Sequence, residues 1–230
     1  MKFYGLQKLT LLDYPGKTAC TVFTGGCNFR CPFCHNASLV ADIDGADTYS
    51  EEEILGFLSK RTGLLDGVCI TGGEPLMHSG IAEFIKKVKD MGYKVKLDTN
   101  GTFPEMLRKL LEDKLVDYVA MDIKNSGEKY AATAGTENIS LSDIEKSINM
   151  LKSTDIDYEF RTTVVREFHT EEDIIKIARW IKGAKKYFLQ NFEDSGNLIG
   201  ENMNAVPKEV LEKMKNSAKA FVENTQIRGV

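Results

Sequence analysis

Short runs of apolar and β-branched residues recur along this 230-residue chain and alternate with longer segments of helical period. Runs of roughly four to eight such residues, bounded by glycine, asparagine or aspartate, are typical of buried β-strands. The pattern predicts six strands, at residues 18–25, 67–72, 93–99, 117–123, 158–165 and 186–192.

The segments between these strands place apolar residues three or four positions apart, which is the period of an amphipathic helix. Start signals support several of them. Ser50 and Glu53 form a candidate capping box, and Thr170 is a candidate N-cap. Pro207 suits a first helical turn. We predict helices at residues 51–65, 81–91, 104–114, 141–152, 171–181 and 207–223.

Strands that alternate with helices at this spacing predict parallel βαβ units, whose crossovers are almost always right-handed. We therefore expect an α/β fold with an open parallel barrel or wound sheet. The length and even composition favour one domain over residues 1–230. The connection at residues 25–50 is far longer than an ordinary βα loop, and long connections of this kind tend to carry function.

Composition and charge narrow the function classes. Hydrophobic residues make up 42% of the chain and charged residues 28%, so wholesale disorder is not expected. The net charge of -4 provides no general attraction to nucleic acid or anionic lipid. The start of the chain lacks a signal-peptide pattern, and no apolar run reaches the length that spans a bilayer. We expect a cytoplasmic protein without a nucleic-acid or membrane partner.

Three of the five cysteines, Cys27, Cys31 and Cys34, fall within one short stretch of the long connection. Cys20 and Cys69 stand apart in apolar strand sequence, where free cysteine usually acts as a small buried hydrophobe. In a reducing compartment, such clustering indicates metal ligation rather than disulfides. Three soft ligands suit zinc or an iron–sulfur cluster. No fourth ligand follows at zinc-finger spacing, so we favour a four-iron cluster with one open iron and keep zinc as the alternative.

Polar residues gather at the carboxyl ends of the predicted strands, where ligands bind in open α/β folds. At residues 71–75 paired glycines allow a ligand to approach the backbone closely, and Glu74 supplies an acceptor. Asp98 and Asp122 end two further strands. Taken alone, a Gly-Gly pair is more often a tight turn, and such acids more often cap the following helices.

The spacing Cys27-x-x-x-Cys31-x-Phe33-Cys34, just after a first strand, resembles the signature of the radical S-adenosylmethionine superfamily. The resemblance covers nearly the whole chain and implies a partial (β/α)6 parallel barrel. It also implies that the three cysteines hold a 4Fe–4S cluster whose open iron binds S-adenosylmethionine, with Phe33 beside the adenine and Asn36 as a nearby hydrogen-bonding partner. From the residues alone, Phe33 could equally pack the loop and Asn36 form a turn.

The strand ends extend this resemblance. Gly72-Gly73-Glu74-Pro75 is similar to the superfamily's second motif, whose backbone receives the methionine amino group. The strand ends at residues 98–101 and 121–124 together resemble the glycyl-radical-enzyme activases, particularly pyruvate formate-lyase activase. This implies that Lys124 meets the methionine carboxylate. It also implies a monovalent cation, suited to hard oxygen donors, enclosed by Asp98, Thr99, the carbonyl of Met121, and Asp122.

Three other polar residues have weaker signals. Arg161 and Gln190 fall in the fifth and sixth predicted strands, where the resemblance would let them contact the carboxylate or the ribose. An arginine in a strand is as often an edge residue or part of a surface ion pair, and Gln190 could satisfy backbone groups. His35 follows Cys34 as in formate-lyase activases, but we assign it no catalytic role.

The resemblance implies an enzyme that reductively cleaves S-adenosylmethionine to a 5′-deoxyadenosyl radical. The activase motifs favour a backbone glycine of a partner glycyl radical enzyme as the target, as for the activating proteins of anaerobic ribonucleoside-triphosphate reductases, with flavodoxin or ferredoxin as electron donor. The segment Asp13-Tyr14-Pro15-Gly16 departs from the Asp-Gly-Pro-Gly common in activases, which leaves the partner open. A small-molecule or nucleoside substrate, or a non-catalytic iron–sulfur or zinc module, are the alternatives.

Overall fold

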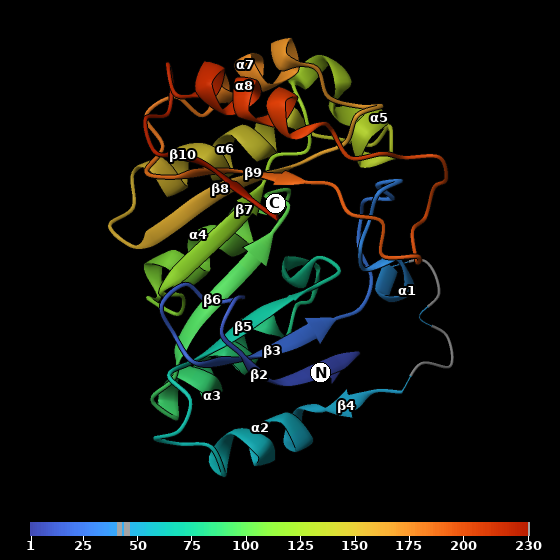
Figure 1. Cartoon of the computed structure of the whole chain (residues 1–230). Coiled ribbons are helices and arrows are strands. Elements are labelled where there is room, and N and C mark those ends of the chain that lie inside the picture. Colours follow the sequence, from blue (N-terminus) through green and yellow to red (C-terminus); the bar gives the residue numbers. More distant parts are fainter. Residues whose placement is uncertain (41–42, 44–46, 230) are drawn as a thin grey trace.

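The computed structural model describes residues 1–40, 43 and 47–229 (Figure 1). Part of the long connection at residues 25–50 thus lies outside the described residues. The strands are β1 (Lys2–Phe3), β2 (Gly5–Thr10), β3 (Ala19–Thr24), β4 (Tyr49–Ser50), β5 (Gly67–Gly72), β6 (Lys94–Thr99), β7 (Tyr118–Asp122), β8 (Asp157–Val164), β9 (Tyr187–Asn191) and β10 (Thr225–Arg228).

Helices occupy most of the segments between the strands. The α-helices are α1 (Ala37–Val40), α2 (Glu51–Ser59), α3 (Ile81–Asp90), α4 (Pro104–Glu112), α5 (Tyr130–Ala134), α6 (Leu141–Lys152), α7 (Glu171–Trp180) and α8 (Lys208–Ala218). Single 3₁₀ turns lie at η1 (Pro75–Met77) and η2 (Gly127–Lys129). Across the part of the chain that the structure describes, no helix is long and apolar enough to cross a membrane.

The main sheet has the strand order β10-β9-β8-β7-β6-β5-β3-β2. From β3 to β10 every neighbouring pair is parallel, and β2 is antiparallel to β3 because a short connection joins the two strands. The six predicted strands correspond to β3 and β5–β9, which confirms the α/β fold class. With β2 and β10 as its edges, the sheet forms an open, partial barrel, and Figure 1 shows helices along its outer side.

Local sequence signals explain where several helices begin. Ser50 accepts a hydrogen bond from the Glu53 N–H, and the Glu53 carboxylate accepts one from the Ser50 N–H, which confirms the predicted capping box. Thr170 caps α7 in the same way with Asp173. Pro207 is the residue immediately before α8, one position earlier than a first-turn residue.

Two predicted helices end earlier than the sequence pattern indicates. Helix α2 ends at Ser59, not at residue 65, and Gly63 has φ +80°, a left-handed backbone conformation that does not continue a helix. Helix α8 ends at Ala218, not at residue 223, because the chain turns there to reach β10. Strands β2 and β10 were not predicted; both lie at edges, where only one neighbour imposes a pattern.

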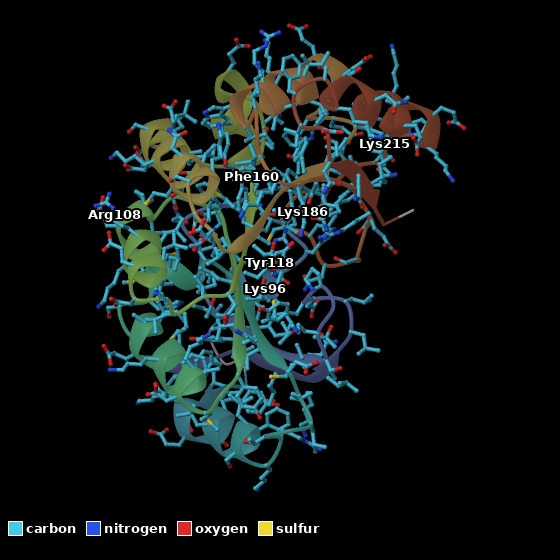
Figure 2. The ribbon with its side chains drawn as sticks, turned by 90° about the vertical axis from the view of Figure 1, so that its left-hand side faces the viewer. Lys96, Arg108, Tyr118, Phe160, Lys186 and Lys215 are labelled. Carbon is cyan, nitrogen blue, oxygen red and sulfur yellow. The ribbon has the colours of Figure 1, made fainter. Side chains whose placement is uncertain are left out.

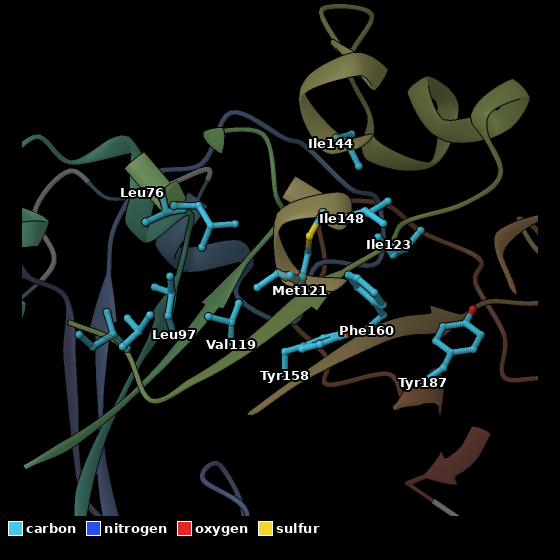
Figure 3. Close-up of a cluster of buried hydrophobic side chains, with 14 of the residues drawn as sticks. Leu76, Leu97, Val119, Met121, Ile123, Ile144, Ile148, Tyr158, Phe160 and Tyr187 are labelled. Carbon is cyan, nitrogen blue, oxygen red and sulfur yellow. The ribbon is translucent and has the colours of Figure 1, made fainter. Parts of the chain in front are cut away.

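The face of the sheet toward the helices is apolar. Figure 3 shows Met121 and Phe160, from neighbouring strands, near Ile148 of α6, and Leu97 of β6 further along the same apolar layer. All four side chains are at most 1% exposed. Because residues alternate across a strand, the positions between them face the inside of the open barrel.

The inner face is polar. Glu159 of β8 is fully buried and accepts hydrogen bonds from the Tyr118 hydroxyl at 2.5 Å and from Arg228 at 2.5 and 2.8 Å. Lys96 of β6 is 2% exposed. In Figure 2, Lys96 and Tyr118 lie near the middle of the molecule, while Arg108 reaches its outside. The strands therefore separate an apolar outer layer from a charged interior.

We expect Leu97→Ala to lower the free energy of unfolding by about 3 kcal/mol, because it leaves a cavity between the sheet and the helices. Chemical denaturation measures this loss. The matched control is Leu64→Ala, at a side chain that is 66% exposed, and it should change stability by less than about 0.5 kcal/mol. Equal losses in the two variants would contradict the assigned packing of Leu97.

Candidate functional site

A cavity of about 250 Å³ lies where the carboxyl ends of the parallel strands converge, and the loop after β3 and the ends of β5 to β9 contribute to its wall. It lies just under the usual size range of small-molecule pockets. Except for Met121, all the candidate site residues from the sequence line it: Cys27, Cys31, Phe33, Cys34, Asn36, Gly72, Gly73, Glu74, Asp98, Thr99, Asp122, Lys124, Arg161 and Gln190.

The cysteine loop follows β3 and is held from the opposite side of the barrel. The Arg30 N–H donates to the carbonyl of Ala134 at 2.9 Å, and the Arg30 guanidinium donates to the carbonyl of Cys27 at 2.6 Å. Gly135 has φ +66°, and a Cβ there would lie 2.0 Å from the Arg30 carbonyl oxygen. Only glycine permits this contact, which fixes the middle of the loop.

The three thiols of the loop differ in exposure. Cys31 is buried, and Cys27 and Cys34 are half-buried. Burial raises the pKa of Cys27 to about 11 and that of Cys31 to about 12, while the nearby Lys124 ammonium acts in the opposite direction. Thiols of this kind bind metal only as thiolates, so loading the loop releases protons. As placed in the described residues, no three Cys, His, Asp or Glu side chains are grouped to hold one metal ion.

The Cys27 sulfur accepts two hydrogen bonds. The Phe29 N–H lies 3.4 Å from it, and Asn100 Nδ2 lies 3.9 Å away and also donates to Asn28 at 2.8 Å. Asn100 follows β6 and lines the cavity, although no role was predicted for it from the sequence. Its place within an Asp-Thr-Asn-Gly strand end was the available signal.

The end of β5 packs backbone against backbone on the end of β3. The Gly73 N–H donates to the carbonyl of Thr24 and the Glu74 N–H donates to that of Gly26, both at 2.8 Å. A Cβ on Gly73 would lie 1.8 Å from the Gly26 carbonyl oxygen. Asn36 Nδ2 donates to the Gly72 carbonyl at 2.8 Å. The paired glycines therefore set the distance between the cysteine loop and the neighbouring strand end.

Both carboxylate oxygens of Glu74 accept hydrogen bonds from other groups of the protein. Oε1 accepts hydrogen bonds from the Leu76 N–H at 3.0 Å and from the Thr99 hydroxyl at 2.8 Å, and Oε2 accepts one from the Asn100 N–H at 2.7 Å. Burial raises the pKa of Glu74 to about 7, and these donors oppose the increase. Glu74 thus joins the ends of β5 and β6 at the cavity wall.

Charged side chains from three neighbouring strands form a connected set. Arg161 of β8 donates to Asp122 at 3.0 Å and to Asp98 at 3.4 Å, and Lys124 donates to Asp122 at 3.2 Å. Burial opposes these charges, but the Arg161 and Lys124 cations outweigh it and hold the pKa of Asp122 at about 2. Arg161 is therefore a bridge between strand ends, not the edge or surface residue that the sequence also allowed.

Phe33, His35 and Gln190 also line the cavity. Phe33 is 4% exposed and packs against Phe168, with ring centroids 5.7 Å apart. His35 stacks on Phe192 and contacts the Glu193 carbonyl through Nε2 at 2.9 Å, which gives it a structural role. Gln190 lines the cavity from β9. Cys20 and Cys69 are buried in strands outside the cavity wall, as the sequence predicted.

An open parallel barrel whose strand ends converge on one polar cavity is the architecture of an α/β enzyme. A family model for the radical SAM superfamily matches residues 21–181. The chain therefore belongs to the radical SAM superfamily, whose members are enzymes that use a 4Fe–4S cluster and S-adenosylmethionine. This confirms the resemblance that the cysteine spacing indicated.

Three relatives share sequence with much of the chain. A Methanocaldococcus jannaschii protein, provisionally named a glycyl-radical enzyme activating enzyme, is 35% identical over 98% of this chain and 95% of its own length. The pyruvate formate-lyase-activating enzyme of Clostridium pasteurianum is 26% identical over 80% of this chain and 77% of that protein. A 7-carboxy-7-deazaguanine synthase of Thermoplasma acidophilum is 28% identical over 67% of this chain and 70% of that protein.

A solved structure shares the fold. A domain of the pyruvate-formate lyase-activating enzyme from Bacteroides vulgatus superposes with a TM-score of 0.58 at 18% identity, covering 71% of this chain and 99% of that domain. At this identity the likeness concerns the fold alone. It agrees with the partial parallel barrel predicted from the sequence and observed in the strand order.

We expect Glu74→Gln to lower the free energy of unfolding by about 2 kcal/mol, because an NH₂ group would replace an acceptor that faces only donors. Chemical denaturation of the metal-free protein tests this. Glu112→Gln, at an exposed position on α4, is the matched control and should have little effect. A loss no larger than that of the control would show that the Glu74 contacts contribute nothing.

Proposed function

We propose that this enzyme cleaves S-adenosylmethionine to form a radical that abstracts a hydrogen atom from a backbone glycine of a partner glycyl radical enzyme. The cleavage of S-adenosylmethionine is supported by one observation, the common cavity. It brings together three thiols, the paired-glycine strand end and two cationic side chains. These are the donor types that an iron–sulfur cluster and an amino-acid moiety require.

In this proposal Cys27, Cys31 and Cys34 hold the cluster. Soft thiolates suit iron, and three of them leave one iron without a protein ligand. The fit is supported by their shared cavity and by the hydrogen bonds that already orient the Cys27 sulfur. The backbone of Gly72 and Gly73 lies next to this loop and receives the methionine amino group.

The remaining candidates divide between the two ends of S-adenosylmethionine. Lys124 and Arg161 supply positive charge for the methionine carboxylate, because both line the cavity and the neighbouring carboxylates raise their pKa, so that neither loses its proton easily there. Phe33 lies within the cysteine loop and Asn36 directly after it, where they meet the adenine. Gln190, from β9, contacts the ribose. These assignments are supported by position along one continuous wall.

The cluster, when bound, supplies the electron that splits the sulfonium C–S bond, a step that no ordinary side chain performs. The chain's own residues bind and orient the sulfonium compound. The buried charged set also gives the carboxylate a fixed position, which limits the orientations of the reacting bond. Flavodoxin or ferredoxin is the proposed electron donor.

The glycyl radical target is supported by the relative that spans nearly the whole chain and is provisionally named an activating enzyme. The Asp-Thr-Asn-Gly and Met-Asp-x-Lys strand ends meet at the same cavity, as the activase resemblance requires. The match to a 7-carboxy-7-deazaguanine synthase favours a small-molecule substrate as the second candidate.

We expect anaerobically reconstituted, reduced protein to convert S-adenosylmethionine to 5′-deoxyadenosine, measured by chromatography. Cys31→Ala should lose both the iron and this activity, because it removes a buried ligand of the loop. Cys20→Ala is the matched control and should keep both, since Cys20 lies in β3 outside the cavity wall. An intact cluster that yields no 5′-deoxyadenosine would reject the enzyme, and zinc in anaerobically purified protein would favour a non-catalytic module.

The partner is tested by electron spin resonance. Reduced protein mixed with S-adenosylmethionine and a glycyl radical enzyme should produce the doublet of a glycine-centred radical. Lys124→Met should reduce the doublet and weaken binding of S-adenosylmethionine together, because one carboxylate contact is lost. Formation of 5′-deoxyadenosine without a doublet, across a panel of glycyl radical enzymes, would favour a small-molecule substrate.

A further inference from the structure

The carboxylates of Asp98 and Asp122 line the cavity, where the activase resemblance implies ligands for an inorganic monovalent cation. Each of their four oxygens already meets a cationic side chain. Arg161 spans both carboxylates, through Nε to Asp122 Oδ1 and through Nη1 to Asp98 Oδ2. Lys124 contacts Asp122 Oδ2. The remaining oxygen, Asp98 Oδ1, accepts a hydrogen bond from Lys96.

Lys96 is a cation built into the interior of the barrel. It lies two residues before Asp98 on β6, so both side chains project from the same face of the strand. Its side chain is only 2% exposed. Although burial opposes the charge, the Asp98 carboxylate holds the pKa of Lys96 above its ordinary value. Lys96 therefore remains an ammonium ion without contact with solvent.

The Thr99 hydroxyl, another predicted cation ligand, is also engaged. It donates to Glu74 Oε1 at 2.8 Å and accepts from the Gly101 N–H at 3.1 Å. The side-chain oxygens assigned to the cation thus have partners within the protein. A metal ion could reach the carboxylate oxygens only by displacing Arg161, Lys96 or Lys124, or by lying beside these cations as a like charge in a buried, weakly screened environment.

The charge balance of the connected side chains also disfavours a bound metal cation. It contains three cations, Lys96, Arg161 and Lys124, and two anions, Asp98 and Asp122, so one positive charge is in excess. One incoming carboxylate neutralises that excess. An additional metal cation would restore it.

We propose that Lys96 and Arg161 take the place of the inorganic cation, so that this cavity binds the carboxylate of S-adenosylmethionine without Na⁺ or K⁺. Lys96 acts as a positioning residue because it neutralises Asp98 from inside the barrel and leaves Arg161 free to bridge the two strand ends. The inference rests on the proposed function, since it takes the cavity as the S-adenosylmethionine site.

The test compares salts at equal ionic strength. Reconstituted wild-type protein is titrated with S-adenosylmethionine in KCl, NaCl and tetramethylammonium chloride, and its Tm is measured in each salt before the ligand is added. We expect the same Kd and the same Tm in all three. Severalfold tighter binding, or a higher Tm, in KCl or NaCl than in tetramethylammonium chloride would overturn the proposal.

Lys96→Met tests the residue itself. In tetramethylammonium chloride it should weaken binding of S-adenosylmethionine by roughly tenfold, because Asp98 is left partly unpaired, and KCl or NaCl should restore part of the loss. Adding Asp98→Asn should remove the salt dependence. Lys109→Met, at an exposed position on α4, is the matched control and should behave as wild type. A Lys96→Met protein that binds as wild type in every salt would contradict the proposed role.

The outcomes separate this inference from the proposed function. Protein that binds no S-adenosylmethionine in any salt would reject the proposed function, and the Tm comparison between salts would still decide the inference. If Lys96→Met fails to fold, the wild-type comparison alone decides it, because metal-ion dependence of the native protein is sufficient to overturn the proposal.

Discussion

The bridge that Arg161 makes between Asp98 and Asp122 is the interaction on which the site depends. It joins side chains from β6, β7 and β8 across the inside of an open barrel, where an isolated charge would be very costly. Lys96 and Lys124 complete the pairing at its two ends. Because every charged side chain in this set contacts one of opposite charge, the inside of the barrel can remain charged. The set ends at the cavity with one positive charge in excess.

Close backbone contact is the second constraint. Gly73 lies so near the Gly26 carbonyl, and Gly135 so near that of Arg30, that no side chain fits at either glycine. The first contact sets the cysteine loop against the end of β5, and the second sets it against the segment after α5. The position of the three thiols therefore follows from two glycines outside the cysteine motif as much as from the motif itself.

Local signals were sufficient for most of the fold. The caps of α2 and α7 are formed by residues close together in the sequence. The apolar runs of β3 and β5–β9 are long enough to predict strands without knowledge of the tertiary structure. The edge strands β2 and β10 and the early end of α8 escaped prediction because they depend on which distant strand is available for pairing. Lys96 escaped for a similar reason. The two-residue spacing of Lys96 and Asp98 was visible, but the contact of Asp98 with Arg161 of β8, two strands away in the sheet, was not.

By itself the sequence determined the alternation of strands and helices, the family signature and most of the residues that line the cavity, because spacing along a chain is enough to recognise a repeated unit and a motif. Only the tertiary structure decided what those residues contact. It placed the Glu74 oxygens on three internal donors and the Asp98 and Asp122 oxygens on fixed cations. Charge pairing across strands depends on the curvature of the sheet and on the register of its strands. Both are set by contacts between residues that lie far apart in the chain.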